Sequence, residues 1–105
     1  MNYVNFISEK LKNDFYSLND KEHQELFKRI DQVIDKLKEN SESGTKVKRK
    51  LWPKEYKKLQ ITNLWKINIS KSWRLIYTIE RDETIIVSII LDWFSHKDYE
   101  RKFKY

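Results

Sequence analysis

Residues 65–93 read WKINISKSWRLIYTIERDETIIVSIILDW, and this stretch decides the fold. It contains runs rich in β-branched and aromatic residues, separated by short polar segments at 70–72 and 81–83. Such runs with short connections predict consecutive antiparallel strands. Glycine and proline each occur once in the chain, so few residues interrupt regular structure.

The two polar segments also predict the strand registers. Residues directly opposite each other in an antiparallel pair point to the same face, so a three-residue loop at 70–72 matches apolar residues with apolar ones. The expected pairs are Ile69 with Trp73, Ile67 with Leu75, and Asn68 with Arg74. The same reasoning at 81–83 predicts the register of the next strand. Its expected pairs are Tyr77 with Val87, Leu75 with Ile89, and Trp73 with Leu91.

These registers give the predicted sheet two unlike faces. One face is continuously apolar and needs a cover. The other face is a mixed surface with a polar end. It carries Lys66, Asn68, Arg74, Ser88 and Asp92, together with Ile76, Ile86 and Ile90.

The first forty residues can supply the cover. Residues 3–6 suit a short edge strand, and Ser8 suits the N-cap of an amphipathic helix. A second amphipathic helix extends to Asn40, with Asn19 and Glu22 at the spacing of a capping box. We therefore expect one α+β domain over residues 1–105, in which an N-terminal helix hairpin packs on one face of a small, mostly antiparallel sheet with a short C-terminal tail.

The net charge of +6 is concentrated in the middle of the chain. Residues 1–40 and 75–105 each carry a net charge of −1, whereas residues 41–74 carry +8. A basic segment between balanced flanks indicates a polyanionic or acidic partner, because a composition that only favours solubility should not spare both flanks. The candidate RNA-binding residues are Lys48, Arg49, Lys50, Lys54, Asn68 and Lys71.

Trp52 and Tyr56 lie among these cations, and their role has two interpretations. Aromatic rings between cations can stack on nucleic-acid bases while the cations pair with phosphates. Alternatively, the two rings anchor a connection to the core. The sequence favours neither interpretation.

Composition excludes several classes of protein. The chain has no cysteine, which excludes disulfides and cysteine metal sites and fits a reducing cytoplasm. It has no apolar run long enough to span a bilayer and no signal peptide, so we expect a cytoplasmic protein that does not enter a membrane. A single histidine with scattered acids makes a poor metal site in residues 65–105, so neither a metal nor a small-molecule cofactor is expected.

Strand order predicts a catalytic cluster at the polar end of the sheet. The third predicted strand ends beside the loop at 70–72, so the chain that follows should deliver His96 and Tyr99 close to Arg74 and Asn68. With Lys66 on the same face, this set suits RNA cleavage by the RNA's own 2′-hydroxyl. That reaction needs a base, an acid, and cations that stabilise the charge of the transition state.

The candidate catalytic residues are Lys66, Arg74, His96 and Tyr99. Histidine titrates close to neutral pH, arginine presents a planar fork to phosphate, and lysine presents a point charge. Tyr99 can donate a proton or stack on a base. Each residue also has a simpler explanation, since Arg74 can pair with Asp92 or Glu80, Lys66 can be a solvated edge charge, and His96 can cap a C-terminal helix. Their convergence with the basic segment favours the functional interpretation.

The chain resembles the RelE/ParE superfamily of toxins from bacterial and archaeal toxin–antitoxin pairs. The resemblance rests on two leading helices, the strand segments Trp65-Lys66-Ile67 and Trp73-Arg74-Leu75-Ile76-Tyr77, a third apolar strand and a charged aromatic tail. The tail reads His-Lys-Asp-Tyr-Glu from His96 and ends in Phe103-Lys104-Tyr105.

The resemblance implies a microbial-ribonuclease-like fold and an mRNA interferase that cleaves ribosome-bound mRNA and inhibits translation. It also implies a cognate antitoxin that neutralises the toxin. By position, Arg74 matches the phosphate-binding arginine, Lys66 a strand lysine, and His96 and Tyr99 the C-terminal pair used for proton transfer and base stacking. Asn68 departs from the pattern, because some ribonuclease members have a second lysine there. Two other functions remain open: a ParE-like poison of DNA gyrase, and an RNA-binding relative without catalysis.

Overall fold

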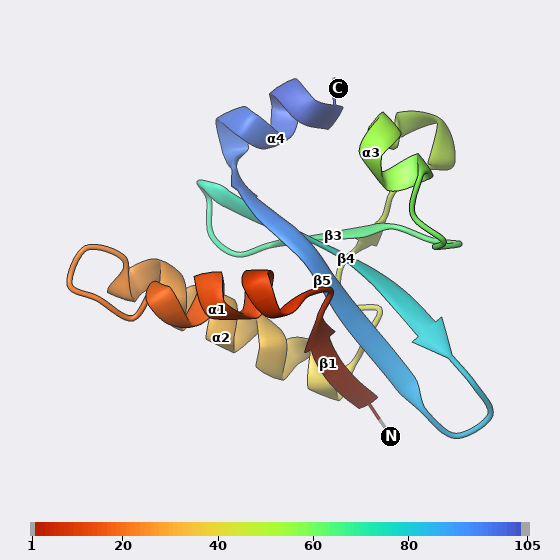
Figure 1. Cartoon of the computed structure of the whole chain (residues 1–105), viewed down its shortest axis with the longest axis horizontal. Coiled ribbons are helices and arrows are strands. Elements are labelled where there is room, and N and C mark those ends of the chain that lie inside the picture. Colours follow the sequence, from red (N-terminus) through yellow and green to blue (C-terminus); the bar gives the residue numbers. More distant parts are fainter. Residues whose placement is uncertain (1, 104–105) are drawn as a thin grey trace.

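The computed structural model describes residues 2–103 and contains a five-stranded sheet of order β1-β5-β4-β3-β2 (Figure 1). The strands are β1 (Asn2–Phe6), β2 (Thr45–Lys46), β3 (Trp65–Asn68), β4 (Trp73–Arg81) and β5 (Ile86–Ser95). The helices are α1 (Glu9–Ser17), α2 (Gln24–Glu39), α3 (Lys54–Lys57) and α4 (His96–Phe103), with a short 3₁₀ helix η1 at Arg49–Leu51. Only β1 pairs in parallel within this sheet, so the predicted α+β class is confirmed.

One of the two predicted helix starts is confirmed. The Ser8 hydroxyl accepts a hydrogen bond from the Leu11 backbone N–H at 3.1 Å, as expected for an N-cap. The capping box at Asn19 and Glu22 is wrong, because α2 begins only at Gln24 after a turn. The Asp20 carboxylate accepts from the His23 backbone N–H at 2.8 Å and satisfies this turn instead.

The first hydrophobic core lies between the α1–α2 hairpin and one face of the sheet (Figure 1). Phe15 of α1 packs between Phe6 of β1 and Phe27 of α2, with ring centroids 5.4 Å and 4.7 Å away. The sheet contributes Ile67, Leu75, Tyr77, Ile79 and Ile90. The amphipathic helices thus cover the apolar face, as their sequence pattern predicts.

The predicted register of β3 with β4 is confirmed, and that of β4 with β5 is wrong. Ile67 lies opposite Leu75, and Asn68 lies opposite Arg74. In contrast, the structure pairs Tyr77 with Ile90, Leu75 with Trp93, and Trp73 with Ser95.

Two local features shift this register. The turn is one residue longer than predicted, because Arg81 pairs with Ile86 and the Asp82 carboxylate accepts hydrogen bonds from two backbone N–H groups inside the turn. Further along, Ile76 lies opposite Asp92 but Tyr77 lies opposite Ile90, so Leu91 is an extra residue that forms a β-bulge.

The sheet has a second core on its other face, where the sequence predicted a mixed surface. Ile86 and Ile90 pack against the first core, whereas Ile76 and Leu91 pack into the second. Helices α3 and α4 contribute to this second core from the upper part of Figure 1. Its buried residues are Val47, Trp52, Tyr56, Leu64, Ile76, Leu91, Tyr99 and Phe103.

Trp52 and Tyr56 are each 5% exposed, so the structure supports their interpretation as core anchors. The Trp52 indole N–H donates to the Val47 carbonyl at 3.0 Å, which satisfies its polar group inside the core. Among residues 2–103, no helix is both long and apolar enough to cross a membrane.

Candidate active site

Three elements bring Lys66, Arg74 and Tyr99 together. Lys66 of β3 and Arg74 of β4 lie on the face of the second core, since their sheet partners there are Ile76 and Phe94. The Lys66 Nζ atom lies 5.6 Å from the centroid of the Tyr99 ring, and the Arg74 Cζ atom lies 5.9 Å from it. Two cations therefore share one aromatic ring, which is a favourable cation–π arrangement.

Helix α4 holds that ring in place. The His96 backbone N–H donates to the Ser72 carbonyl at 2.6 Å, and the Ser95 hydroxyl accepts from the Asp98 N–H at 3.2 Å. Tyr99 stacks on Phe103 at 4.5 Å, and each of these rings is 2% exposed. The helix is thus tied to the β3–β4 loop at its start and to the second core along its length.

Arg74 has an unusual environment for a cation. Its Nη1 atom is buried and has no hydrogen-bond partner in the described part of the chain. The alternative pairings with Asp92 or Glu80 are not formed among those residues. A buried donor without an acceptor costs about 1–3 kcal/mol, and more when it is charged, so this guanidinium is disposed to bind an anion.

His96 lies at the same end of the sheet but contacts an acid of its own helix. Its Nε2 atom lies 2.9 Å from the Glu100 carboxylate, and its side chain is 46% exposed. The backbone bond to Ser72 places His96 beside the loop that leads into Arg74. The structure therefore brings Lys66, Arg74 and Tyr99 into contact and places the His96 imidazole next to Glu100.

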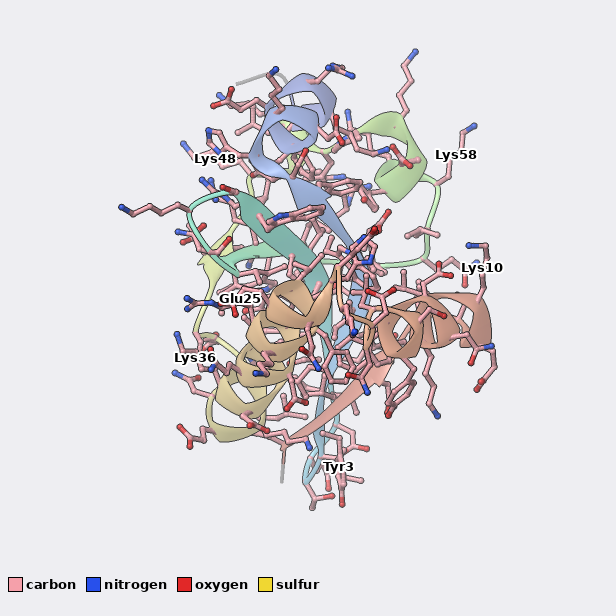
Figure 2. All side chains as sticks on the ribbon, turned by 90° about the vertical axis from the view of Figure 1, so that its left-hand side faces the viewer. Tyr3, Lys10, Glu25, Lys36, Lys48 and Lys58 are labelled. Carbon is pink, nitrogen blue, oxygen red and sulfur yellow. The ribbon has the colours of Figure 1, made fainter. Side chains whose placement is uncertain are left out.

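The predicted RNA-binding residues all lie at the surface. Lys48, Arg49, Lys50, Lys54, Asn68 and Lys71 are exposed. The Arg49 guanidinium lies 4.9 Å from the Trp52 ring, so this cation is partly ordered by the core anchor. In Figure 2, Lys48 and Lys36 lie along one edge of the molecule, and Lys58 and Lys10 lie along the other.

A pocket of about 420 Å³, which we call the edge pocket, adjoins this cluster at the open edge of β3. Its polar lining is formed by Lys36, Ser43, Thr45, Lys66, Asn68 and Arg74. The sequence pattern does not single out Lys36, because a lysine on the polar face of an amphipathic helix is usually a solvated residue without a specific role. The signal that could have found it is its place in the last turns of α2, just before the loop that leads into β2.

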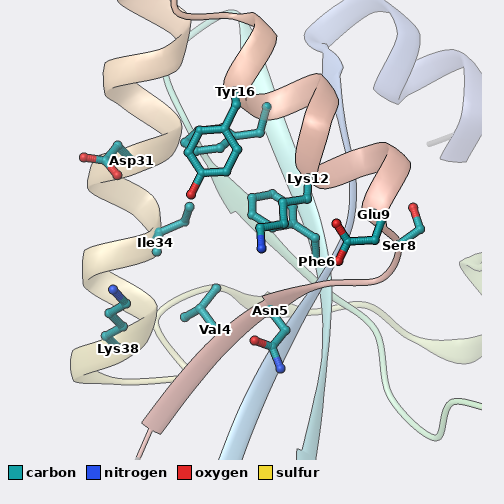
Figure 3. Close-up of a pocket in the computed structure, with 11 residues that line it drawn as sticks. Val4, Asn5, Phe6, Ser8, Glu9, Lys12, Tyr16, Asp31, Ile34 and Lys38 are labelled. Carbon is teal, nitrogen blue, oxygen red and sulfur yellow. The ribbon is translucent and has the colours of Figure 1, made fainter.

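A second pocket, of about 440 Å³, lies between β1 and the helix hairpin (Figure 3). Its charged lining has both signs, with the acids Glu9 and Asp31 and the cations Lys12 and Lys38 (Figure 3). Tyr16, which is 59% exposed, lies over it. Mixed charge gives this pocket no preference for an anion, and it shares no lining residue with the edge pocket.

Asp92 is a half-buried acid in the second core. Burial raises its pKa above the ordinary value of 3.8, partly offset by a 2.8 Å hydrogen bond from the Trp93 N–H and by the Lys102 ammonium group. Lys102 itself pairs with Glu55 at 2.6 Å, so its charge is shared between two acids. Burial also raises the pKa of the neighbouring Tyr56 hydroxyl, with a further contribution from the charge of Asp92.

The raised pKa of Asp92 predicts a pH-dependent stability. The folded state binds this proton more tightly than the unfolded state, so the free energy of unfolding falls as pH rises from 3.8 through the raised value. Asp92→Asn should therefore gain stability relative to wild type between about pH 3 and pH 7. Denaturant unfolding at both pH values measures this, with the exposed Asp35→Asn as control. A difference between Asp92→Asn and wild type that does not change with pH would contradict the prediction.

Among residues 2–103, no group of three or more His, Cys, Asp or Glu side chains is placed to hold a metal ion. The sequence-predicted tail residues Lys104 and Tyr105 lie outside the described residues.

The structure is a small α+β domain, and comparison with known families shows to which family it belongs. The family model for the ParE toxin of the type II toxin–antitoxin system, parDE, matches residues 6–92. The chain therefore belongs to this family, within the RelE/ParE superfamily, and is the toxin of a toxin–antitoxin pair with a cognate antitoxin as partner. Searches of curated proteins and of solved structures found no significant match.

Proposed function

We propose that this toxin is an endoribonuclease that cleaves ribosome-bound mRNA and thereby inhibits translation. The observation that carries the proposal is the buried Nη1 of Arg74, which has no hydrogen-bond partner among residues 2–103 and is held with Lys66 around the Tyr99 ring. A cationic pair in which Arg74 has a buried donor with no acceptor among the described residues suits the phosphate of an RNA backbone.

The reaction uses the RNA as its own nucleophile. The 2′-oxygen attacks the adjacent phosphorus as its proton passes to a base, and the bond from phosphorus to the 5′-oxygen breaks as that oxygen receives a proton. The products are a 2′,3′-cyclic phosphate and a free 5′-hydroxyl. Arg74 and Lys66 stabilise the additional negative charge that develops on the phosphate oxygens.

His96 supplies proton transfer in this scheme. Its contact with Glu100 orients the imidazole, which in its charged form can donate a proton to the leaving 5′-oxygen. Tyr99 has a different role. Because its ring is 2% exposed and stacked on Phe103, it supports the two cations rather than offering a face to an RNA base.

The direct test is cleavage of a defined RNA by the purified toxin, with and without ribosomes. We expect products that end in a 2′,3′-cyclic phosphate, and no cleavage when a single 2′-deoxynucleotide replaces the residue before the cleaved bond. Intact RNA under both conditions would overturn the proposal. Cleavage that persists with the 2′-deoxy substrate would refute the mechanism.

A second candidate function is inhibition of DNA gyrase, as in the ParE-like alternative. The observation that favours it is the extent of the family match, which ends at residue 92 and therefore excludes His96 and Tyr99. A gyrase supercoiling assay separates the two candidates. Inhibition of supercoiling, with RNA left intact, would assign the toxin to this second function.

A further inference from the structure

The edge pocket exists because β2 is short. This strand contains only Thr45 and Lys46, which pair with Lys66 and Trp65 of β3. Within the described sheet, the remainder of β3, at Ile67 and Asn68, therefore has no neighbouring strand on that side. The pocket occupies this open edge and reaches from α2 to Arg74.

The charges around the edge pocket have one sign. Lys36, Lys66 and Arg74 line it, and no carboxylate does so in the part of the chain that the structure describes. Neither Lys36 nor Arg74 forms an ion pair with another described residue. Glu42, the nearest acid in the preceding loop, is held by Arg81 at 3.1 Å. A concave site whose described lining contains cations and no carboxylate raises the local concentration of anions.

Specific hydrogen bonds hold the loop that forms one wall of the edge pocket. The buried Tyr77 hydroxyl donates to the Ser41 carbonyl at 2.7 Å and accepts from the Gly44 N–H at 3.1 Å, which fixes the loop against the sheet. Gly44 is required by this close approach, because a Cβ atom there would collide with the Lys66 carbonyl oxygen. The Thr45 hydroxyl and the Asn68 amide supply further donors to the lining, whereas the Ser43 hydroxyl donates to the Asn40 carbonyl at 2.6 Å.

We propose that the edge pocket is a second phosphate subsite, which holds the RNA phosphodiester next to the one that is cleaved. The inference rests on the proposed ribonuclease function and assigns Lys36 as a binding residue. Lys66 and Arg74 border both places, so one RNA strand can pass from the Tyr99 cluster over the edge of β3 and present consecutive phosphates to them. Lys36 contacts only the second phosphate. Asn68 lies between the two phosphates, at the position where a second cation would otherwise stand.

The test uses a matched pair of lysines on α2. Lys36→Gln removes the edge-pocket cation, whereas Lys38→Gln removes a cation that lines the pocket between β1 and the helix hairpin (Figure 3). Binding of a fluorescent, uncleavable 2′-O-methyl RNA is measured by anisotropy over a range of salt. Lys36→Gln should weaken binding by about fivefold and reduce the salt slope by about 0.7, the contribution of one phosphate contact in single strands. Lys38→Gln should change neither.

A neutral methylphosphonate at successive linkages then identifies the phosphate concerned. At one linkage, the methylphosphonate should weaken the binding of RNA to the wild-type toxin by about fivefold. The same modified RNA should bind to Lys36→Gln as tightly as unmodified RNA does. Equal affinity and salt slope for both lysine variants, with RNA cleavage intact, would overturn the second subsite and leave the ribonuclease function standing. Weakened binding by Lys36→Gln in a toxin that does not cleave RNA would keep the subsite and remove the ribonuclease function. A wild type that does not bind RNA would overturn both.

Discussion

Arg74→Ala is expected to lower the rate of RNA cleavage by about 10²–10³-fold, which is the usual cost of removing one donor that stabilises transition-state charge. The guanidinium has a buried Nη1 atom with no partner among the described residues and lies 5.9 Å from the centre of the Tyr99 ring. Loss of this group leaves Lys66 as the cation beside the Tyr99 ring. Single-turnover cleavage of a defined RNA measures the effect, and growth arrest on expression should disappear in parallel.

Arg74→Ala should keep its fold, so a loss of cleavage can be attributed to the missing guanidinium. Removing a buried donor that lacks an acceptor among the described residues eliminates a desolvation cost that offsets the lost contact with the Tyr99 ring, so the melting temperature of Arg74→Ala should stay close to that of wild type. Arg81→Ala is the matched control, because Arg81 lies at the far end of β4 and pairs with Glu42. Arg74→Lys should recover only part of the rate, since an ammonium cannot form a bidentate contact. Full activity in Arg74→Ala would remove this residue from the mechanism.

Tyr99→Ala is expected to produce the largest loss of stability, about 3–5 kcal/mol in the free energy of unfolding, as for other large aromatic residues truncated in a core. The ring is 2% exposed and stacks on Phe103. A domain of this size has a total stability of about 5–15 kcal/mol, so the variant should lose a large share of it and α4 should no longer be anchored. Equilibrium urea unfolding measures this loss.

Tyr99→Phe removes the hydroxyl and keeps the ring, so it separates the contributions of the two groups. It keeps the stacked ring and the contacts of both cations with its face, so it should retain most of the stability and the affinity for RNA. If Tyr99→Phe cleaves RNA as poorly as Tyr99→Ala while remaining folded, the hydroxyl takes part in proton transfer. If Tyr99→Ala is as stable as wild type, the assignment of α4 to the second core is wrong.

The sequence predicts β3 and β4 well because their pattern alternates. Polar Lys66 and Asn68 interrupt apolar Trp65, Ile67 and Ile69, which leaves one register that matches both faces. That register correctly placed Lys66 and Arg74 on one face, and the order of the strands placed Tyr99 close to them. The part of the site that depends on pairing could therefore be predicted.

The sequence does not predict β5 because this strand is buried on both faces. Residues 85–91 read IIVSIIL, and a nearly continuous apolar run contains no alternation that could fix a register. The sequence pattern therefore predicts neither the bulge at Leu91 nor the longer turn at Asp82, and it does not predict the second core. The edge pocket was missed for a related reason, since it depends on how far β2 extends and on where α2 ends.

The bulge in β5 also restricts how this chain can change length. Before Leu91, residues that face the helix hairpin alternate in one phase, and after it they alternate in the opposite phase. A regular pleat that kept Leu91 would exchange the directions of Trp93 and Phe94 and turn the start of α4 to the wrong side of the sheet, whereas deleting Leu91 would restore the pleat and keep both directions. A single-residue insertion between Asp92 and Ser95 should therefore be poorly tolerated, even where every individual substitution is accepted, whereas deletion of Leu91 should keep α4 on its side of the sheet. The spacing of this segment, more than its residue identities, carries the information that joins the strand to the helix.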